Sequence, residues 1–179
     1  LAYTSCSDSW LDLNPSTSVP TDQAFSSLED AQSALNGIYR LASAHSYYGD
    51  NFFYFGDCRA ADVQARMTKG DGRRVSPYYE YNVKATDSFN SSLPWNQVYK
   101  VIRQTNNLIA ATESGLIKTT DEAALNEIKA QALAMRGLAL YDLIRVFAMP
   151  YSYDNGQSLG VPIVTTATDQ SSKPARNTV

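Results

Sequence analysis

A cluster of tyrosines is the part of this sequence best suited to hold a ligand. Tyr78, Tyr79 and Tyr81 are followed by Asn82 and lie in a long polar stretch, residues 67–92. Loops of that length in compact domains are usually functional or disordered. Aromatic rings can stack on a ligand while amide and hydroxyl groups bond its polar atoms. A structural alternative stands beside this, because Tyr79, Tyr81 and Val83 alternate as a segment does when it packs one face onto its neighbours.

A smaller polar set precedes this stretch. Asp57, Arg59 and Asp62 follow an aromatic run, and Arg66 lies close behind them. At helical spacing such residues form surface ion pairs, which is the simpler interpretation of the set.

Catalytic and metal-binding motifs are missing from the sequence. It contains no G-x-S-x-G elbow, no H-E-x-x-H pair and no P-loop. His45 is the single histidine, and Cys6 and Cys58 are the two cysteines, so no ligand set for a structural zinc exists. A carboxylate pair for glycoside hydrolysis could be drawn from any of the 18 acids, which neither supports nor excludes it. We predict a protein that is not an enzyme and has no cofactor.

Charge and hydropathy narrow the class of protein further. The net charge of −3 argues against nucleic-acid binding, which needs clustered Lys and Arg. No run of 18 or more apolar residues is present, so no segment has the composition of a membrane-spanning helix.

Four helical segments account for most of the apolar pattern. The first runs from Thr21 to about Ser43, with Thr21 or Asp22 as its cap. The second, from about Tyr47 to Arg66, is a broken helix interrupted by Gly49 and Gly56 and buried through its Phe52, Phe53 and Phe55. Pro94 opens a third helix that ends near Glu113. The fourth begins at a Thr119–Glu122 capping box and ends near Phe147, since Pro150 forbids its continuation.

Packing expectations follow from these helices. Asn106 lies inside an apolar stripe and is predicted to bond a neighbouring backbone, and Arg136 to pair with a buried acid or cap a carbonyl. Few charges occur between residues 130 and 148, so the fourth helix is predicted to be central, with small residues that let its partners approach: Ala130, Ala132, Ala134, Gly137 and Ala139. Residues 150–179 are predicted to be loop-like, with a strand-like run at Val161–Thr165. The fold class is all-α: antiparallel helical hairpins in a TPR-like or alpha-solenoid arrangement, with a long loop between the second and third helices.

Five stretches resemble the N-terminal, TPR-like half of the SusD/RagB family in order and spacing: CSDSWLDLNP, SLEDAQSALNGIYRLAS, GDCRAADV, WNQVYKVIRQTNNLI and IKAQALAMRGLALYDLIRVFAMPY. Most specific are Trp95-x-x-x-Tyr99-x-x-Ile102-x-x-x-Asn106 and the pair of Ala132 and Arg136 ahead of Pro150. Both are fold signatures, so Trp95 is expected in the core. Ala148 departs from the glycine usual in the family. Family members are much longer, so the chain resembles a fragment.

The resemblance implies a function. Members of the SusD/RagB family are outer-membrane lipoproteins that capture nutrients, mostly glycans, for a SusC-like TonB-dependent transporter. Family ligand contacts come partly from the segment between the second and third helices. By this resemblance the candidate ligand residues are Arg59, Asp62, Tyr78, Tyr79, Tyr81 and Asn82. A helical-repeat scaffold that binds proteins and never touches glycan is the alternative.

The cysteine near the N-terminus fits the same family. Cys6 resembles a lipobox cysteine, acylated on its thiol, although Tyr3 stands where leucine is usual. Residues 1–20 would then comprise the end of a signal peptide and a tether, residues 21–179 the helical domain, and the protein would be lipid-anchored at the cell surface. The alternative is a Cys6–Cys58 disulfide.

Overall fold

The computed structural model describes residues 24–60, 76–82, 94–167 and 172–179. Within these residues every regular element is a helix and no strand is formed. In chain order the elements are α2 (Leu28–Ala42), the π-helical turn η2 (His45–Gly49), α3 (Asn51–Asp57), α4 (Ser76–Tyr79), α5 (Trp95–Glu113), α6 (Glu122–Phe147) and α7 (Tyr151–Asp154). The all-α prediction is confirmed.

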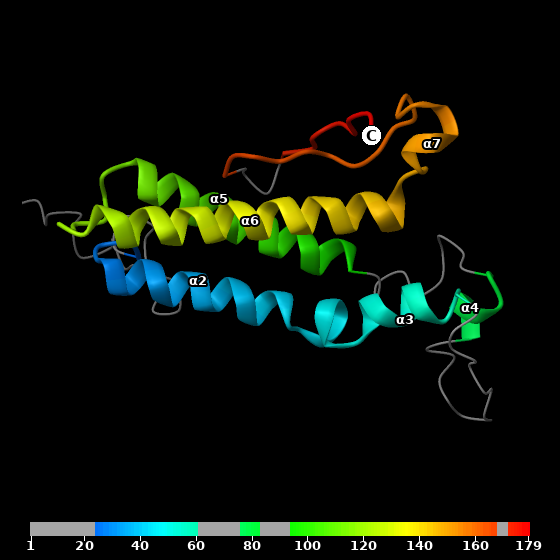
Figure 1. Cartoon of the computed structure of the whole chain (residues 1–179), viewed down its shortest axis with the longest axis horizontal. Helices are drawn as coiled ribbons and strands as arrows, with labels where there is room; N and C mark the ends of the chain where they lie inside the picture. Colours follow the sequence, from blue (N-terminus) through cyan, green and yellow to red (C-terminus); the bar gives the residue numbers. More distant parts are fainter. Residues whose placement is uncertain (1–23, 61–75, 83–93, 168–171) are drawn as a thin grey trace, which may run out of the picture.

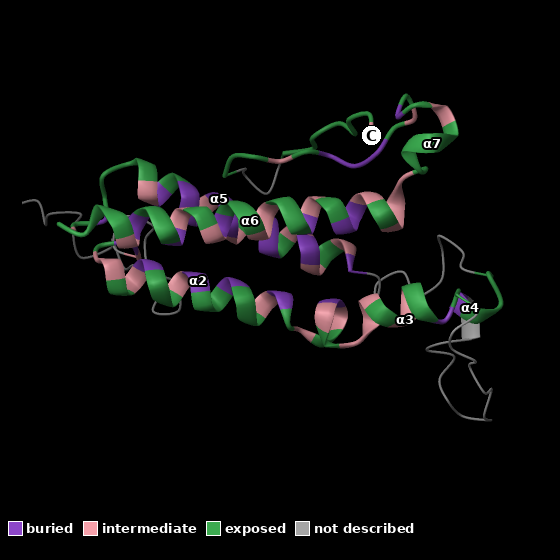
Figure 2. Cartoon of the chain, viewed as in Figure 1, coloured by how far each residue is buried: buried purple, intermediate pink, exposed green. Residues whose placement is uncertain are grey.

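Three long helices form the body of the molecule. Helix α5 runs antiparallel to α6, and α2 lies alongside both (Figure 1). Their facing sides are buried while their outer sides are exposed (Figure 2). The core combines branched side chains of α5 with those of α2 and α6, among them Leu35, Ile38, Val98, Val101, Ile102, Leu108, Ile128 and Leu143. These positions recur every three to four residues, as one face of a helix requires.

Helix α2 begins later than the sequence pattern indicates. Its cap is Ser27, whose hydroxyl accepts from the Asp30 amide while the Asp30 carboxylate accepts from the Ser27 amide. The predicted caps Thr21 and Asp22 lie outside the described residues, and the single helix predicted from there to Ser43 is interrupted at residues 25–27. The reason is long-range: the Lys118 amide donates to the Ser26 carbonyl, so this stretch joins the α5–α6 connection instead of extending the helix.

The start of α6 also differs from the prediction. Asp121, not Thr119, is the cap, because its carboxylate accepts from the Ala124 amide at 3.0 Å. The Thr119 hydroxyl instead accepts from the Asp121 amide at 3.0 Å, which shapes the turn ahead of the helix. An acidic cap also complements the partial positive charge at a helix N-terminus.

The predicted break in the second helical segment is confirmed, and it lies at Gly49. The Ala44 carbonyl accepts from the amides of both Tyr47 and Gly49, which forms the wide turn η2. A Cβ on Gly49 would come within 2.8 Å of the Ala44 carbonyl carbon and oxygen, so only glycine fits. Gly56, by contrast, sits inside α3 and its Cβ position is open.

Helix α6 is less enclosed than predicted. Of its small residues only Ala132 and Ala139 are buried, and Ala130, Ala134 and Gly137 are exposed. Leu133, Leu138 and Tyr141 share this exposed side of the helix. One side of α6 therefore faces solvent in this chain.

The C-terminal part runs back over the helical body in extended form (Figure 1). The strand predicted at Val161–Thr165 does not form, and only an isolated bridge between Leu159 and Thr178 is present there. Instead, the Asn106 side-chain amide donates to the carbonyls of Val164 and Thr166 at 3.0 and 3.1 Å. The prediction that Asn106 bonds a neighbouring backbone is therefore confirmed.

The turn before this segment has two further features. The short helix α7 lies within residues 150–179, which the sequence pattern predicts to be loop-like. Ala148 has φ −120° and ψ 163°, an extended conformation open to any L-residue, so the glycine usual in the family is not needed here.

Candidate ligand-binding surface

The predicted ligand residues fall on a small unit that we call the α3–α4 module, residues 51–60 and 76–82. It lies at the end of the molecule where α6 ends (Figure 1). Its interior is a packing cluster of Cys58 and Tyr78, against which Tyr54, Phe55 and Phe147 pack. The Phe55 and Tyr78 rings meet edge to face with centroids 5.8 Å apart. Because Phe147 belongs to α6, this cluster attaches the module to the helical body.

Arg59 organises the surface of this module. Its guanidinium lies over the Phe55 ring at 4.7 Å and over the Tyr81 ring at 5.6 Å. The Tyr81 hydroxyl donates to the Arg59 carbonyl. Such cation–π contacts hold the planar guanidinium in place while leaving its N–H groups free to donate.

Tyr81 adopts an unusual backbone conformation. Its φ is +54°, in the left-handed region that a bulky residue rarely enters. Tyr81 is 68% exposed, so burial does not account for this conformation. The contacts to Arg59 hold it instead, and strained residues of this kind occur preferentially at functional sites.

The structure separates the predicted site residues into three groups. Tyr79 is 41% exposed, and Tyr81, Arg59 and Asn82 are exposed as well. Tyr78 is only 2% exposed and serves the packing of the module. Asp62 lies outside the described residues, as does Val83.

Two alternatives from the sequence can now be compared with the structure. The alternating packing of Tyr79 and Tyr81 is not observed, since both rings are exposed. Between Asp57 and Arg59 no ion pair forms, and Arg59 stacks on aromatic rings instead.

The prediction that Phe52, Phe53 and Phe55 bury helix α3 is only partly correct, because Phe52 and Phe55 are half-buried against the two core clusters. The helix has no buried residue, and Phe53 is exposed on it. Sequence reasoning thus missed Phe53 as a possible contact and Phe55 as the support of Arg59. The density of aromatic residues in NFFYF was the available signal.

The surroundings of Cys58 make its thiol unreactive. It is a buried free thiol, so the proposed disulfide with Cys6 is not formed in this structure, and Cys6 itself lies outside the described residues. Burial, together with the nearby Asp57 charge, raises the pKa of the thiol. A thiol with a raised pKa is a poor nucleophile, which favours a packing role.

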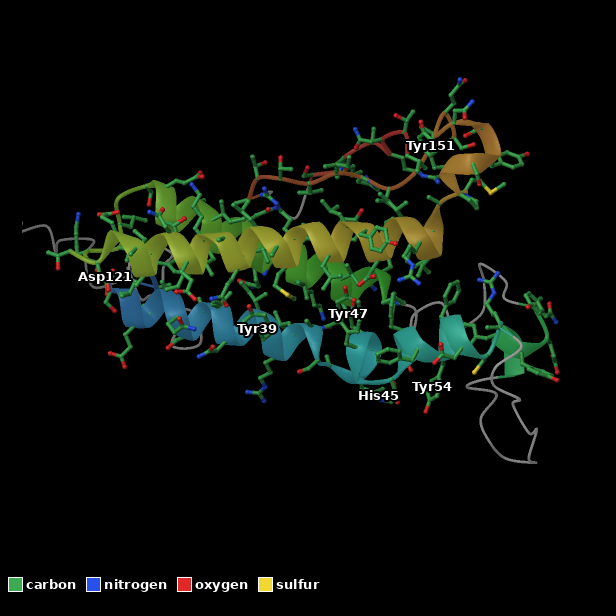
Figure 3. The ribbon with its side chains drawn as sticks, in the orientation of Figure 1. Tyr39, His45, Tyr47, Tyr54, Asp121 and Tyr151 are labelled. Atoms are coloured by element: carbon green, nitrogen blue, oxygen red, sulfur yellow. The ribbon has the colours of Figure 1, made fainter. Side chains whose placement is uncertain are left out.

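A buried acid fastens the segment before the module to α6. Asp142 is 1% exposed, and one of its carboxylate oxygens accepts from the hydroxyls of Tyr47 and Tyr48 at 2.5 and 2.6 Å. Figure 3 shows Tyr47 between η2 and the pair α5–α6. Burial raises the pKa of Tyr47 and raises that of Tyr48 to about 12, with Asp142 adding to both shifts. The one sign of this contact in the sequence is an acid within an apolar helix.

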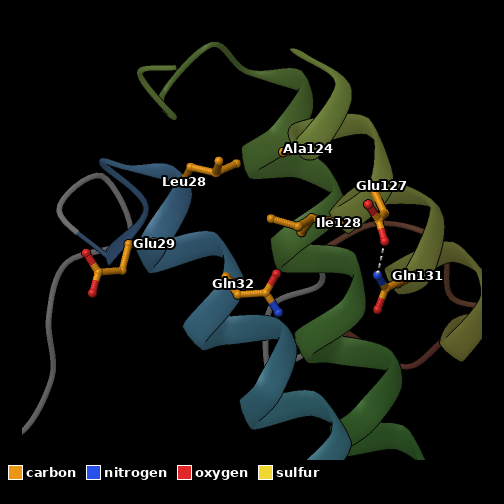
Figure 4. A pocket seen from close by; sticks show the side chains of 7 residues that line it. All are labelled: Leu28, Glu29, Gln32, Ala124, Glu127, Ile128 and Gln131. Carbon is orange, nitrogen blue, oxygen red and sulfur yellow. Dashed lines mark hydrogen bonds between the residues drawn. The ribbon is translucent and has the colours of Figure 1, made fainter. Parts of the chain in front are cut away.

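A hollow of about 490 Å³ lies between α2 and the N-terminal half of α6 (Figure 4). Its lining includes two acids, Glu29 and Glu127, and no aromatic ring. Gln131 in its wall already bonds Glu127 and the Tyr39 hydroxyl. None of the predicted ligand residues lies there.

Two further properties concern the described residues as a whole. They hold no group of three or more His, Cys, Asp and Glu side chains suited to a metal ion. None of their helices is both long and apolar enough to cross a membrane.

Known proteins resemble this chain over most of its length. A SusD-like family model, described as "Starch-binding associating with outer membrane", matches residues 9–179. A solved SusD superfamily protein from Bacteroides thetaiotaomicron VPI-5482 is 68% identical, with a TM-score of 0.79 over 85% of this chain and 33% of that one. Another, from Bacteroides vulgatus ATCC 8482, is 32% identical with a TM-score of 0.79, over 86% of this chain and 34% of that one.

A curated relative agrees with these matches. SusD-like protein P2 of Formosa agariphila is 31% identical over 156 residues, which are 84% of this chain and 29% of the relative. The chain thus spans about a third of the length of the relatives that it matches. With the helical fold and the signatures around Asn106 and Arg136, these matches show that the chain belongs to the SusD-like family.

Proposed function

We propose that this chain is the N-terminal helical part of a non-catalytic surface protein that binds glycans and delivers them to a SusC-like TonB-dependent transporter. The family description, starch-binding and associating with the outer membrane, supports the ligand class and the location. The observation that carries the proposal is the exposed surface of the α3–α4 module, where Tyr79 and Tyr81 accompany the stacked Arg59.

The chemistry of this surface suits a neutral sugar. Sugar rings present C–H faces that stack on aromatic side chains and hydroxyls that bond planar polar groups. The exposed tyrosine rings can stack on the C–H faces of a sugar, and the Arg59 guanidinium and the Asn82 amide can bond its hydroxyls. Asp62 remains a proposed member of the site, and Tyr78 is proposed to support it from beneath.

Calorimetric titration with a starch oligosaccharide such as maltoheptaose, alongside other neutral oligosaccharides, tests the proposal. We expect saturable binding that weakens about tenfold in Tyr81→Ala, because an aromatic contact of this kind contributes about 1 kcal/mol or more. Tyr153→Ala is a matched control, since Tyr153 is equally exposed, at 68%, but lies on α7. Equal losses in both variants, or no binding of any sugar, would count against the site.

Location is a separate part of the proposal. We propose that Cys6 is lipid-modified, that residues 1–20 form the leader remnant and tether, and that residues 21–179 form the helical domain. Two or more acyl chains, at about 0.8 kcal/mol per buried CH₂, anchor a protein stably. Mass spectrometry of native, membrane-extracted protein should find acyl chains on Cys6, and a free Cys6 would refute the anchor.

The alternative of a protein-binding scaffold draws on a different observation. The exposed side of α6, with Leu133, Leu138 and Tyr141, could meet another protein. The two functions predict different results in binding experiments. A scaffold binds no sugar, and Leu133→Glu would abolish its binding to a partner protein while Tyr81→Ala would not.

A further inference from the structure

A cavity on another part of the molecule is not used by the proposed glycan surface. It measures about 360 Å³ and lies between the first half of α5 and the C-terminal extended segment. Cavities that hold small ligands typically measure about 300–1,000 Å³. Its walls include Trp95, Tyr99, Arg103, Pro162, Val164 and Pro174.

The wall from α5 is a single helix face. Trp95, Tyr99 and Arg103 follow one another at intervals of four residues, which places their side chains one above the other along the helix. Each interval spans about 6 Å of helix axis. The aromatic rings of Trp95 and Tyr99 therefore line one part of the cavity. The Arg103 guanidinium follows them along the helix at a distance of about one ligand ring.

Two carbonyls in the opposite wall already accept hydrogen bonds from the protein. The Pro162 carbonyl accepts from the Tyr99 hydroxyl at 2.9 Å, and the Val164 carbonyl accepts from the Asn106 amide at 3.0 Å. These two carbonyls are therefore engaged before a ligand enters the cavity.

Donors remain free. Among the residues that the structure describes, neither the Arg103 guanidinium nor the Trp95 indole N–H has a hydrogen-bond or ion-pair partner. Arg103 is exposed, at the edge of the cavity, and no acid occurs among the described residues of the lining. A guanidinium without a partner among the described residues can bind a carboxylate with two parallel hydrogen bonds.

We propose that this cavity binds a ring-bearing carboxylate, with the ring against Trp95 and Tyr99 and the carboxylate paired to Arg103. Aromatic acids and acidic sugars share this chemistry. Because Arg103 is exposed, the pair is screened by water and salt, so binding is weak and falls as the salt concentration rises.

Two acids and their neutral counterparts test this in ¹H–¹⁵N NMR titrations of the whole chain. Benzoate is compared with benzyl alcohol, and glucuronate with glucose, and the readout is the Trp95 indole resonance, assigned with a Trp10→Phe variant. We expect at least one acid to shift this resonance saturably and its neutral counterpart to bind at least several-fold more weakly. Benzoate alone would identify an aromatic acid as the ligand, and glucuronate alone an acidic sugar.

Substitutions decide whether Arg103 is responsible. Arg103→Gln should weaken binding of the acid about tenfold, and Arg103→Lys should restore part of it. Lys100→Gln is the matched control, because Lys100 is an exposed cation on the same helix outside the cavity lining. No shift with either acid, equal binding of acid and neutral counterpart, or equal losses in Arg103→Gln and Lys100→Gln would overturn the proposal. The tests of this cavity do not use Tyr79 or Tyr81, so a failure of this proposal can be told from a failure of the proposed glycan surface.

Discussion

Arg136 of α6 donates from one guanidinium nitrogen to the Asn106 side-chain oxygen of α5 at 2.9 Å and to the Thr165 carbonyl at 3.0 Å. Asn106 in turn donates to the carbonyls on either side of Thr165. Two helices and the C-terminal segment are thus joined by one network, which confirms that Arg136 caps a carbonyl.

Asn106→Ala should lower the free energy of unfolding by about 2–3 kcal/mol, measured by urea titration. Asn106 is 2% exposed, and its loss leaves two carbonyls without their donor and removes one of the two acceptors of Arg136. Asn96→Ala, at an exposed position of the same helix, should change stability by less than about 0.5 kcal/mol. Similar losses in the two variants would contradict the role assigned to the network.

The two glycines of the second helical segment should respond oppositely to alanine. Gly49→Ala should cost about 1–3 kcal/mol of stability, because the added methyl group meets the Ala44 carbonyl. Gly56→Ala should be neutral or stabilise by up to about 1 kcal/mol, because its Cβ position in α3 is open. Thermal unfolding of both variants checks the pair, and a stabilised Gly49→Ala protein would refute the tight turn.

Alkaline pH should destabilise the fold through Tyr48. Its pKa is raised from the usual value near 10 to about 12, so the folded protein holds this proton more tightly than the unfolded chain does. The stabilisation is complete below about pH 10 and is lost as the pH rises towards about 12.

Urea titrations across that pH range compare the native protein with Tyr48→Phe. The variant should lose stability less steeply with pH, since the phenylalanine has no proton to release. Tyr54→Phe is a suitable control, because Tyr54 lies on α3 and makes no contact with Asp142. Identical pH slopes in the native and Tyr48→Phe proteins would argue against the Asp142 contact.

Cys58 should be protected from thiol reagents in the folded protein. In a Cys6→Ser background, labelling by a disulfide reagent near pH 8 should be much slower than for a free thiol, because burial hides the sulfur and raises its pKa. Addition of urea should restore full reactivity. Rapid labelling without denaturant would mean that the packing between α3 and α4 opens readily.

Sequence reasoning was most successful where local pattern decides structure. The bounds of α5, the end of α6 and the break at Gly49 follow from helical periodicity, Pro94, Pro150 and glycine. It failed where partners distant in sequence decide: Ser27 caps α2 because Lys118 holds the preceding residue, and Asp142 is buried because two tyrosines reach it. The exposure of aromatic side chains on the α3–α4 module could not be predicted from the sequence either, because tyrosine and phenylalanine suit a core and a binding surface equally.

Phe147 stands between the two surfaces proposed to bind ligands. Its ring meets Trp95 edge to face with centroids 4.9 Å apart, and it also packs against the cluster of Cys58 and Tyr78. A ligand that shifts the Trp95 indole would reach the support of the exposed tyrosines through this ring, and any such coupling between the two sites is reciprocal. A single ring thus gives the two surfaces a direct route for cooperation or competition.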